Sequence, residues 1–249
     1  MIDLHCHIIP DVDDGAANAA AACAMAEHSL RVGVDTIVAT PHCNLRGARL
    51  CTDGRAYAEA FELFRALLRQ RRIPLTLLSG AEVFAHPANF RQLLDGGRLV
   101  TLNRSRYLLV EFRFQADERE ISALLAAVVQ HGLIPVVAHP ERYAAVQRRP
   151  SLVAEWFADG YIIQMNKGSL LGRLGVDAER TAFRLLHHGL VHVIATDAHD
   201  PIRRPTGFLS LLSMAERFCP REYLHLLLEE NPRRIIGDKP VCAPSEVML

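Results

Sequence analysis

The sequence has little that would suit a secreted, membrane-inserted or nucleic-acid-binding protein. No apolar run approaches the roughly 18 residues that span a bilayer, because charged residues interrupt every hydrophobic stretch. No secretory signal precedes the first apolar run, which begins at Ile2. The 28 basic and 28 acidic residues cancel, so no long-range field attracts nucleic acid or an anionic membrane. These absences predict a cytoplasmic protein that inserts into no membrane and binds no nucleic acid.

Cysteine is sparse, and its spacing suggests no cross-link. Six cysteines are scattered along 249 residues without a CxxC pair, which favours reduced thiols over a disulfide framework or a thiolate zinc site. Linkers, low-complexity tracts and repeats are also missing, and 249 residues suit one sizeable core. We therefore expect a single catalytic domain over residues 1–237 and a polar C-terminal tail over 238–249.

What the sequence does contain is a regular alternation of strands and helices. Seven short β-rich apolar runs are predicted as strands: Ile2–His5, Val34–Thr40, Leu75–Glu82, Tyr107–Phe112, Ile134–His139, Tyr161–Asn166 and Val191–Asp197. The amphipathic stretches between them are predicted as helices: Ala16–Val32, Arg55–Arg71, Glu118–His131, Ser151–Asp159 and Ala178–His188. Residues 206–237 are predicted as one or two further helices. The alternation predicts a parallel sheet covered by helices, and seven repeats favour a closed barrel over an open doubly wound sheet.

Most of the predicted strands end in residue types that bind metal ions. His5 and His7 lie two apart on the first strand, so both imidazoles can reach one ion. The other candidates are Asp14, in the loop after that strand, and the strand-end residues His42, Glu82, Glu111, His139, Asp197 and His199. The C-terminal ends of barrel strands converge, which favours a shared metal site over a rim of unconnected polar groups.

The number and type of these candidates limit the metal. Nine side chains exceed what one ion can hold, which predicts two or three divalent ions with Glu82 as a bridge. Imidazole and carboxylate ligands without thiolate favour manganese, iron or zinc.

Several short motifs, in order along the chain, resemble those of a known superfamily. They are His5-Cys6-His7, Asp13-Asp14-Gly15, Ala39-Thr40-Pro41-His42, Gly80-Ala81-Glu82, His139-Pro140-Glu141-Arg142-Tyr143, Gln164-Met165-Asn166-Lys167-Gly168-Ser169-Leu170 and Thr196-Asp197-Ala198-His199. The chain resembles the polymerase-and-histidinol-phosphatase (PHP) superfamily from residue 1 to about residue 236. Within it, the chain is most similar to the bacterial manganese-dependent protein-tyrosine phosphatases of capsule and exopolysaccharide clusters.

This resemblance implies a fold and a set of ligands. The fold is a single distorted (β/α)7 TIM-like barrel with extra C-terminal helices and a trinuclear site. The implied ligands are His5, His7, Glu82 and Asp197 for the first ion, Glu82, Glu111 and His139 for the second, and Asp14, His42 and His199 for the third. Asp11 and Asp13 lie next to Asp14 and are alternatives to it, or partners that orient the ligands.

The resemblance also implies residues that contact the substrate. Arg142 and Arg204 match the phosphate-contacting positions, with Arg203 as the alternative to Arg204, and arginine suits phosphate oxygens because it binds them bidentately. The predicted reaction is hydrolysis of a phosphotyrosine monoester by a metal-bridging hydroxide.

The implied substrate is a phosphotyrosine protein, the tyrosine-rich tail of a cognate bacterial tyrosine kinase that regulates capsular or exopolysaccharide synthesis. One alternative is a small-molecule phosphomonoesterase of the histidinol-phosphatase kind, because fold and metals alone do not distinguish the two. A second alternative is a binding module in which the metals only hold the fold.

One motif suggests a different phosphatase chemistry. His42-Cys43 and the residues through Arg49 spell H-C-x5-R, the signature of cysteine-dependent tyrosine phosphatases. Arg46 stands inside the loop where small residues would have to wrap a phosphate, so we interpret Cys43 as an unreactive thiol. Lys167 is likewise interpreted as a solvated residue at a strand end.

Overall fold

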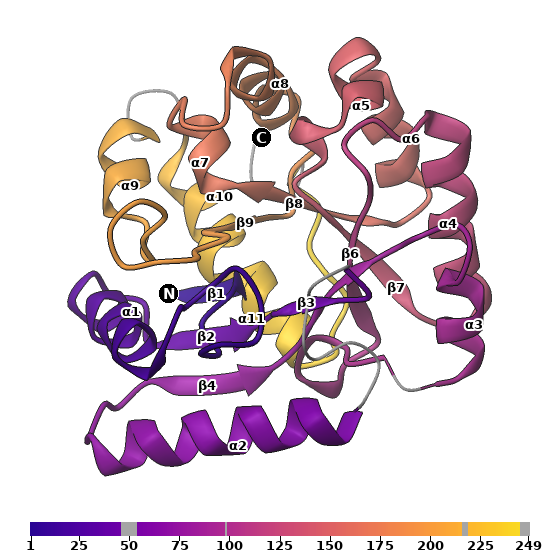
Figure 1. The fold of residues 1–249 in the computed structure, drawn as a ribbon. Coiled ribbons are helices and arrows are strands. Elements are labelled where there is room, and N and C mark those ends of the chain that lie inside the picture. The colour runs from indigo at the N-terminus through magenta and orange to yellow at the C-terminus, as the bar shows by residue number, and fades with distance from the viewer. Residues whose placement is uncertain (46–53, 98, 216–218, 245–249) are drawn as a thin grey trace.

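The computed structural model describes residues 1–45, 54–97, 99–215 and 219–244, which form an α/β fold with parallel strands (Figure 1). One sheet has the order β1-β2-β4, with β1 at Ile2–Cys6, β2 at Thr36–Ala39 and β4 at Thr76–Ser79. The other has the order β3-β5-β6-β7-β8-β9. Its strands are β3 (His42–Cys43), β5 (Glu82–Phe84), β6 (Tyr107–Glu111), β7 (Ile134–Ala138), β8 (Ile162–Asn166) and β9 (Val193–Ala195). The predicted parallel arrangement is therefore confirmed.

All seven predicted strands are present, and two of them are divided. Thr40 and Pro41 separate β2 from β3, and Gly80 and Ala81 separate β4 from β5. Pro41 has no N–H to donate to a ladder, which interrupts pairing at that point. Beyond the break, Glu82 N donates to Pro41 O at 3.1 Å, so the second halves of both strands join the other sheet.

The outer strands β1 and β9 of the two sheets lie side by side. Asp197 N donates to His5 O, and His7 N donates to Ala198 O, each at 2.8 Å. The buried carboxylate of Asp3 accepts hydrogen bonds from the backbone and hydroxyl of Thr196. These contacts bring the ends of the first and last strands together, which places two candidate ligand segments next to each other.

The helices cover the sheets as the periodicity predicts. The five predicted helices correspond to α1 (Ala19–Arg31), α2 (Gly54–Gln70), α4 (Glu118–Gln130), α6 (Ser151–Ala158) and α8 (Val176–His187). The C-terminal helices are α9 (Leu209–Ala215), α10 (Arg221–His225), the π-turn η3 (Leu226–Glu230) and α11 (Asn231–Ile236). No helix among the described residues is long and apolar enough to cross a membrane.

Other elements escape the sequence analysis because they are too short for a helical period. They are α3 (Phe90–Asp95), α5 (Ala144–Arg148), α7 (Lys167–Leu170) and the 3-10 turns η1 (Leu102–Arg104) and η2 (Pro140–Arg142). The expected tail is attached to the body through residue 242, since Tyr107 Oη donates to Lys239 O and Cys242 N donates to Asn231 Oδ1.

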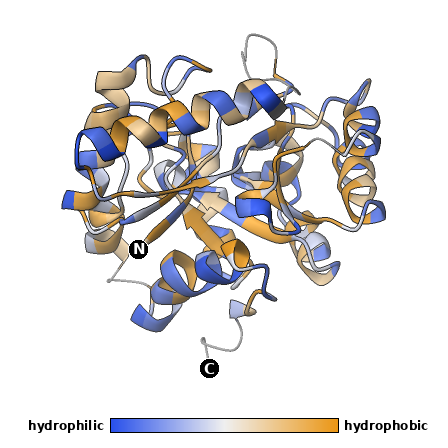
Figure 2. Cartoon of the chain, turned by 90° about the horizontal axis from the view of Figure 1, so that it is seen from below, coloured by the Kyte–Doolittle hydropathy of each residue, from blue (hydrophilic) through white to orange (hydrophobic). Residues whose placement is uncertain are grey.

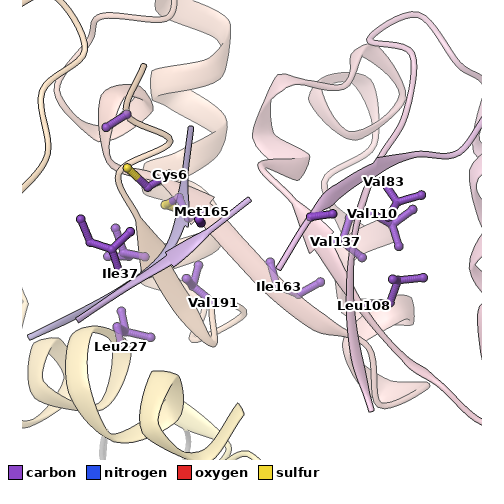
Figure 3. Packing of buried hydrophobic residues seen from close by; sticks show 14 of the residues in the cluster. Cys6, Ile37, Val83, Leu108, Val110, Val137, Ile163, Met165, Val191 and Leu227 are labelled. Carbon is purple, nitrogen blue, oxygen red and sulfur yellow. The ribbon is translucent and has the colours of Figure 1, made fainter. Parts of the chain in front are cut away.

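Buried side chains form two clusters on opposite faces of the strands. The larger lies between strands and helices (Figure 3), and the helices turn their apolar sides toward it (Figure 2). The smaller contains side chains from both sheets and Ile235 of α11. Residues of the smaller cluster alternate with those of the larger, so Tyr107, Leu109 and then Glu111 share one face of β6. The face that is apolar at the start of a strand thus becomes polar at its end.

A fixed loop connects β9 to α9 and carries Arg204. The Asp200 carboxylate accepts the N–H groups of residues 202–204. From the other side, the buried Lys167 ammonium donates to Pro205 O at 2.7 Å and Gly207 O at 2.8 Å. Gly207 has φ +86°, and a Cβ added there would lie 2.1 Å from Cγ2 of Val32, the residue that caps the C-terminus of α1. The loop therefore packs against α1 at a position that only glycine fits.

This close approach predicts a large effect for Gly207→Ala. Gly160 is the matched control, because its φ is +83° and nothing lies within 4 Å of an added Cβ. We expect Gly160→Ala to cost about 1 kcal/mol through backbone strain alone, and Gly207→Ala about 2 kcal/mol more through overpacking. Urea unfolding followed by fluorescence of the single tryptophan, Trp156, measures both. Val32→Ala should recover part of the loss in the Gly207→Ala background, and equal costs at the two glycines would contradict the steric explanation.

Candidate metal centre

The first group of candidate ligands comes from the end of β1, the start of β5 and the residues that follow β9. His5 Nε2 lies 3.2 Å from Glu82 Oε2 and 3.5 Å from Asp197 Oδ1. His7 Nε2 lies 3.3 and 3.5 Å from the same two oxygens, and the two Nε2 atoms are 3.2 Å apart. A tetrahedral ion at about 2.0–2.1 Å from four ligands requires ligand atoms about 3.3–3.4 Å apart. The nitrogens of His5 and His7 and the oxygen of Glu82 therefore have the mutual spacing of three ligands on one ion, and Asp197 lies close to both nitrogens.

Partners outside this group hold the two imidazoles in place. Gln164 Oε1 on β8 lies 2.9 Å from His5 Nδ1, and Asp13 Oδ2 lies 2.7 Å from His7 Nδ1. Each partner leaves the Nε2 atom directed at the carboxylates, because a hydrogen bond at the other ring nitrogen fixes the orientation of a metal-ligating histidine. Asn166 Nδ2 donates to Asp197 Oδ2 at 2.6 Å and fixes that carboxylate as well.

Glu82 extends the site to a second group of ligands. Its other oxygen, Oε1, lies 3.0 Å from His139 Nε2, and Glu111 Oε1 is 3.6 Å from the same nitrogen. His139 follows β7 with φ +32°, a left-handed conformation that turns the chain sharply into η2. Glu82 thus faces both groups, as the predicted bridging carboxylate would.

The third group lies at the open side of the site. Asp14 Oδ1 is 3.4 Å from both His42 Nε2 and His199 Nε2. His42 also connects this group to the others, since its Nδ1 lies 3.1 Å from Glu82 Oε2. The structure therefore brings together all nine residues predicted from the strand ends.

The ligand-type side chains shift one another's pKa values, because their charges are buried close together. Burial lowers the pKa of His7, but hydrogen bonds to Asp13 and Glu82 outweigh it and raise that pKa to about 9. Burial opposes charging of His42 too, yet Asp14 and Glu82 raise its pKa to about 11. Burial and the nearby Glu82 raise the pKa of Glu111 to about 8. Protons thus neutralise buried carboxylates here, and bound metal ions would displace them.

Residue chemistry therefore fits a set of divalent ions. All candidates except Asp14 are buried, and they form overlapping groups whose ligand atoms lie within 4.8 Å of one another. The buried Nδ1 atom of His42 lies 3.1 Å from Glu82 Oε2 but makes no hydrogen bond of acceptable geometry with any described residue. A buried polar atom without a partner is costly, and a cation nearby would offset that cost.

The site opens into a pocket of about 260 Å³. Arg142 and Arg204 line it, and both point at Asp197 Oδ2, from 3.6 and 2.6 Å respectively. On another side the pocket is bounded by apolar groups, which are Leu45, Phe84, Phe112 and Phe114. The Arg142 guanidinium lies 4.3 Å from the ring centroid of Phe114, so cation and aromatic ring support each other. An anion next to an apolar group would fill this pocket.

Some roles become clear only in three dimensions. Asp13 orients His7, whereas Asp14 faces the pocket. The backbone holds this turn close, because a Cβ on Gly15 would lie 2.2 Å from His7 O. Asp11 belongs to none of the ligand groups found among the described residues. Phe114 carries no signal in the sequence. Gln164 and Asn166 stand there only within a motif of the resemblance, without a role, although they continue the alternating face of β8 that predicts inward side chains.

The two remaining sequence candidates also have defined positions. Cys43 is buried on β3, where it pairs in register with Val83, and Arg49 lies outside the described residues. Lys167 is only 4% exposed and anchors the Arg204 loop, so its interpretation as a solvated residue is wrong. Its ammonium group reaches two backbone carbonyls instead of water.

Comparison with known proteins places this site in context. The chain is 34% identical to the tyrosine-protein phosphatase YwqE of Bacillus subtilis over 97% of this chain and 93% of that protein. It is 32% identical to the tyrosine-protein phosphatase CpsB of Streptococcus pneumoniae, over 96% of this chain and 99% of that protein.

A solved structure gives the same result for the fold. It comes from work on YwqE from Bacillus subtilis and CpsB from Streptococcus pneumoniae, described as unique metal-dependent tyrosine phosphatases. It superposes with a TM-score of 0.87 at 32% identity and covers 97% of this chain and 96% of that one. Residues 1–237 match the family described as capsular polysaccharide synthesis, CpsB/CapC. The chain therefore belongs to the CpsB/CapC family.

Proposed function

We propose that this protein is a metal-dependent tyrosine-protein phosphatase linked to capsular polysaccharide synthesis. Its relatives YwqE and CpsB are named tyrosine-protein phosphatases, and the related structure is described as metal-dependent. The observation that carries the proposal is one pocket lined by seven of the nine ligand-type side chains, by Arg142 and Arg204 and by an aromatic wall. No ligand position of the proposed centre is lost, which argues against a module that only binds.

The proposed centre holds two or three divalent ions. His5, His7, Glu82 and Asp197 would hold the first, Glu82, Glu111 and His139 the second, and Asp14, His42 and His199 the third. Imidazole and carboxylate donors favour manganese, with iron and zinc as alternatives. When bound, the ions supply Lewis acidity and lower the pKa of water, which provides hydroxide for attack on phosphorus near neutral pH.

The chain's own residues bind and orient the phosphate. The Arg142 and Arg204 guanidinium groups would leave Asp197 in part and donate to the phosphoryl oxygens, over which negative charge is spread in the transition state. Phe114 keeps Arg142 in position through its ring. Asp13, Gln164 and Asn166 hold the ligands still, so little reorganisation is needed during the reaction.

The aromatic wall favours an aryl phosphate over a small alkyl phosphate such as histidinol phosphate. Phe112 is 1% exposed, whereas Phe114 is 39% exposed and lines the pocket beside Arg142. A phenyl ring attached to the phosphate would cover this exposed apolar surface and stack on it. An alkyl alcohol would leave it in water.

Further proposals concern the fold, the domain bounds, the substrate and the compartment. We propose that the strands of both sheets, which share the smaller core cluster, make a distorted (β/α)7 barrel of the PHP type with added C-terminal helices. Residues 1–237 would be the catalytic domain and 238–249 its tail. The substrate would be a cognate bacterial tyrosine kinase that regulates capsule or exopolysaccharide synthesis, and the enzyme would meet it in the cytoplasm, where ATP for tyrosine phosphorylation is made.

The substrate class is tested by comparing two esters. We expect kcat/KM for a phosphotyrosyl peptide to exceed that for histidinol phosphate by at least about tenfold, since ring burial contributes on the order of 1–2 kcal/mol. Phosphate release by manganese-loaded protein measures both rates. A preference for histidinol phosphate would establish the small-molecule alternative.

The type of chemistry is tested by removing either metals or thiol. Chelation should abolish hydrolysis and manganese should restore it, because the ions are needed for both substrate binding and nucleophile activation. Cys43→Ser should retain activity within about twofold, as expected for a residue outside the machinery. The reverse pattern, with activity resistant to chelation and lost on Cys43→Ser, would identify cysteine-dependent catalysis.

Phe114 provides a test of the aromatic wall. We expect Phe114→Leu to lower the ratio of kcat/KM for para-nitrophenyl phosphate to that for phosphoserine by about fivefold, the value of one aromatic contact. Loss of support for Arg142 lowers both rates and therefore cancels in the ratio. Phe114→Tyr keeps the ring and should keep the ratio. An unchanged ratio in Phe114→Leu would show that the ring does not contact the leaving group.

A further inference from the structure

A second cavity, of about 270 Å³, is lined by residues of α5 and α8. These two helices are in contact and are labelled in Figure 1. The charged lining of the cavity consists of Arg148 from α5, and Arg180, Arg184 and Asp177 from α8. Three guanidinium groups thus share one carboxylate, in a protein whose basic and acidic residues are equal in number, 28 of each. This arginine cavity has a local excess of positive charge that the metal centre does not use.

Neighbouring arginines show that this excess is not typical of the surface. Arg149, next to Arg148, is paired with Glu118 at 2.9 Å and Glu155 at 2.7 Å. Arg148 and Arg184 have no carboxylate partner among the described residues, and the Arg180 to Asp177 distance is 3.8 Å between exposed side chains. The cavity therefore has donor capacity left for an anion.

The cavity is physically connected to the metal centre. Gln147, which lines it, donates from Nε2 to Glu141 O at 2.9 Å. Glu141 lies in η2, between His139 and Arg142, and η2 also packs against α8. The segment that carries the phosphate-binding Arg142 thus continues directly into one wall of the cavity.

The separation of the two sites suits one peptide. Cα atoms of η2, which ends at Arg142, lie within 8 Å of Cα atoms in α5 and in α8, the two helices that line the cavity. An extended peptide covers that distance in about three residues. An anionic side chain three residues from the reacting phosphotyrosine could therefore reach the cavity.

We propose that the arginine cavity binds a second anionic side chain, phosphate ester or carboxylate, of the same polypeptide substrate. This proposal rests on the proposed tyrosine-phosphatase function. Guanidinium groups bind both oxyanions through paired N–H donors, and a dianionic phosphate gains more from them than a carboxylate does. The second anion is held without being hydrolysed, because the cavity lacks the cluster of metal ligands.

Binding of three labelled peptides to manganese-loaded protein tests the proposal without turnover. Each peptide carries non-hydrolysable phosphonomethyl-phenylalanine at the reacting position and, three residues away, a second phosphonomethyl-phenylalanine, glutamate or alanine. We expect Arg180→Gln/Arg184→Gln to raise Kd for the doubly phosphonated peptide by about fivefold and for the glutamate peptide by less. Fluorescence anisotropy measures each Kd, and the Kd of the alanine peptide should stay within about twofold.

A matched pair of substitutions separates a local site from overall charge. Arg69→Gln/Arg71→Gln also removes two positive charges, at the end of α2, and should leave all three Kd values unchanged. An equal loss in this control, an equal loss for the alanine peptide, or no loss for the doubly phosphonated peptide would overturn the proposal. Hydrolysis of para-nitrophenyl phosphate by the same samples tests the proposed function separately.

Discussion

The buried carboxylate of Glu82 is the constraint around which the strand ends are organised. Its two oxygens face the imidazoles of His5, His7, His42 and His139, which come from three separate parts of the chain. A carboxylate that is 1% exposed is costly to bury unless charge and hydrogen bonds compensate. Protons on His7 and His42, whose pKa values are raised, contribute to that compensation, and metal ions would do so when bound. Gln164 and Asp13 hold the imidazoles of His5 and His7 in this arrangement.

Much of the site can be predicted from the sequence, because residues of metal-binding types stand at or just after the ends of the predicted strands. Glu111 shows why this works, since it extends the alternation of Tyr107 and Leu109 beyond the apolar core into the site. The roles of Gln164 and Asn166 do not follow, because they depend on how β8 lies against distant β1 and β9. The division of the second strand cannot be predicted in full either. Pro41 indicates a break, but the sequence pattern alone does not show that the chain then joins the other sheet. Short helices such as α5 carry too few residues for a period.

Burial distinguishes two chemistries that share one dipeptide. In the sequence alone, His42 and Cys43 fit both a metal centre and a cysteine-dependent phosphatase. On β3 successive side chains point to opposite faces, so His42 reaches Glu82 and Asp14 while Cys43 belongs to the larger core cluster. A thiolate nucleophile needs a polar, accessible environment that lowers its pKa, which an apolar core does not offer. The alternation of side chains along β3 therefore favours the metal centre over a cysteine nucleophile.

Two adjacent residues, Asn166 and Lys167, connect the metal half of the pocket to the phosphate half. Asn166 donates to Asp197, a candidate ligand, and Lys167 holds the loop that carries Arg204. Burying an ammonium group costs free energy, and here the two carbonyl acceptors exist only when residues 205–207 are in place. Arg204 in turn lies 2.6 Å from the same Asp197. The candidate ligand Asp197, the candidate phosphate-binding Arg204 and the loop that carries it are therefore all positioned by one turn after β8.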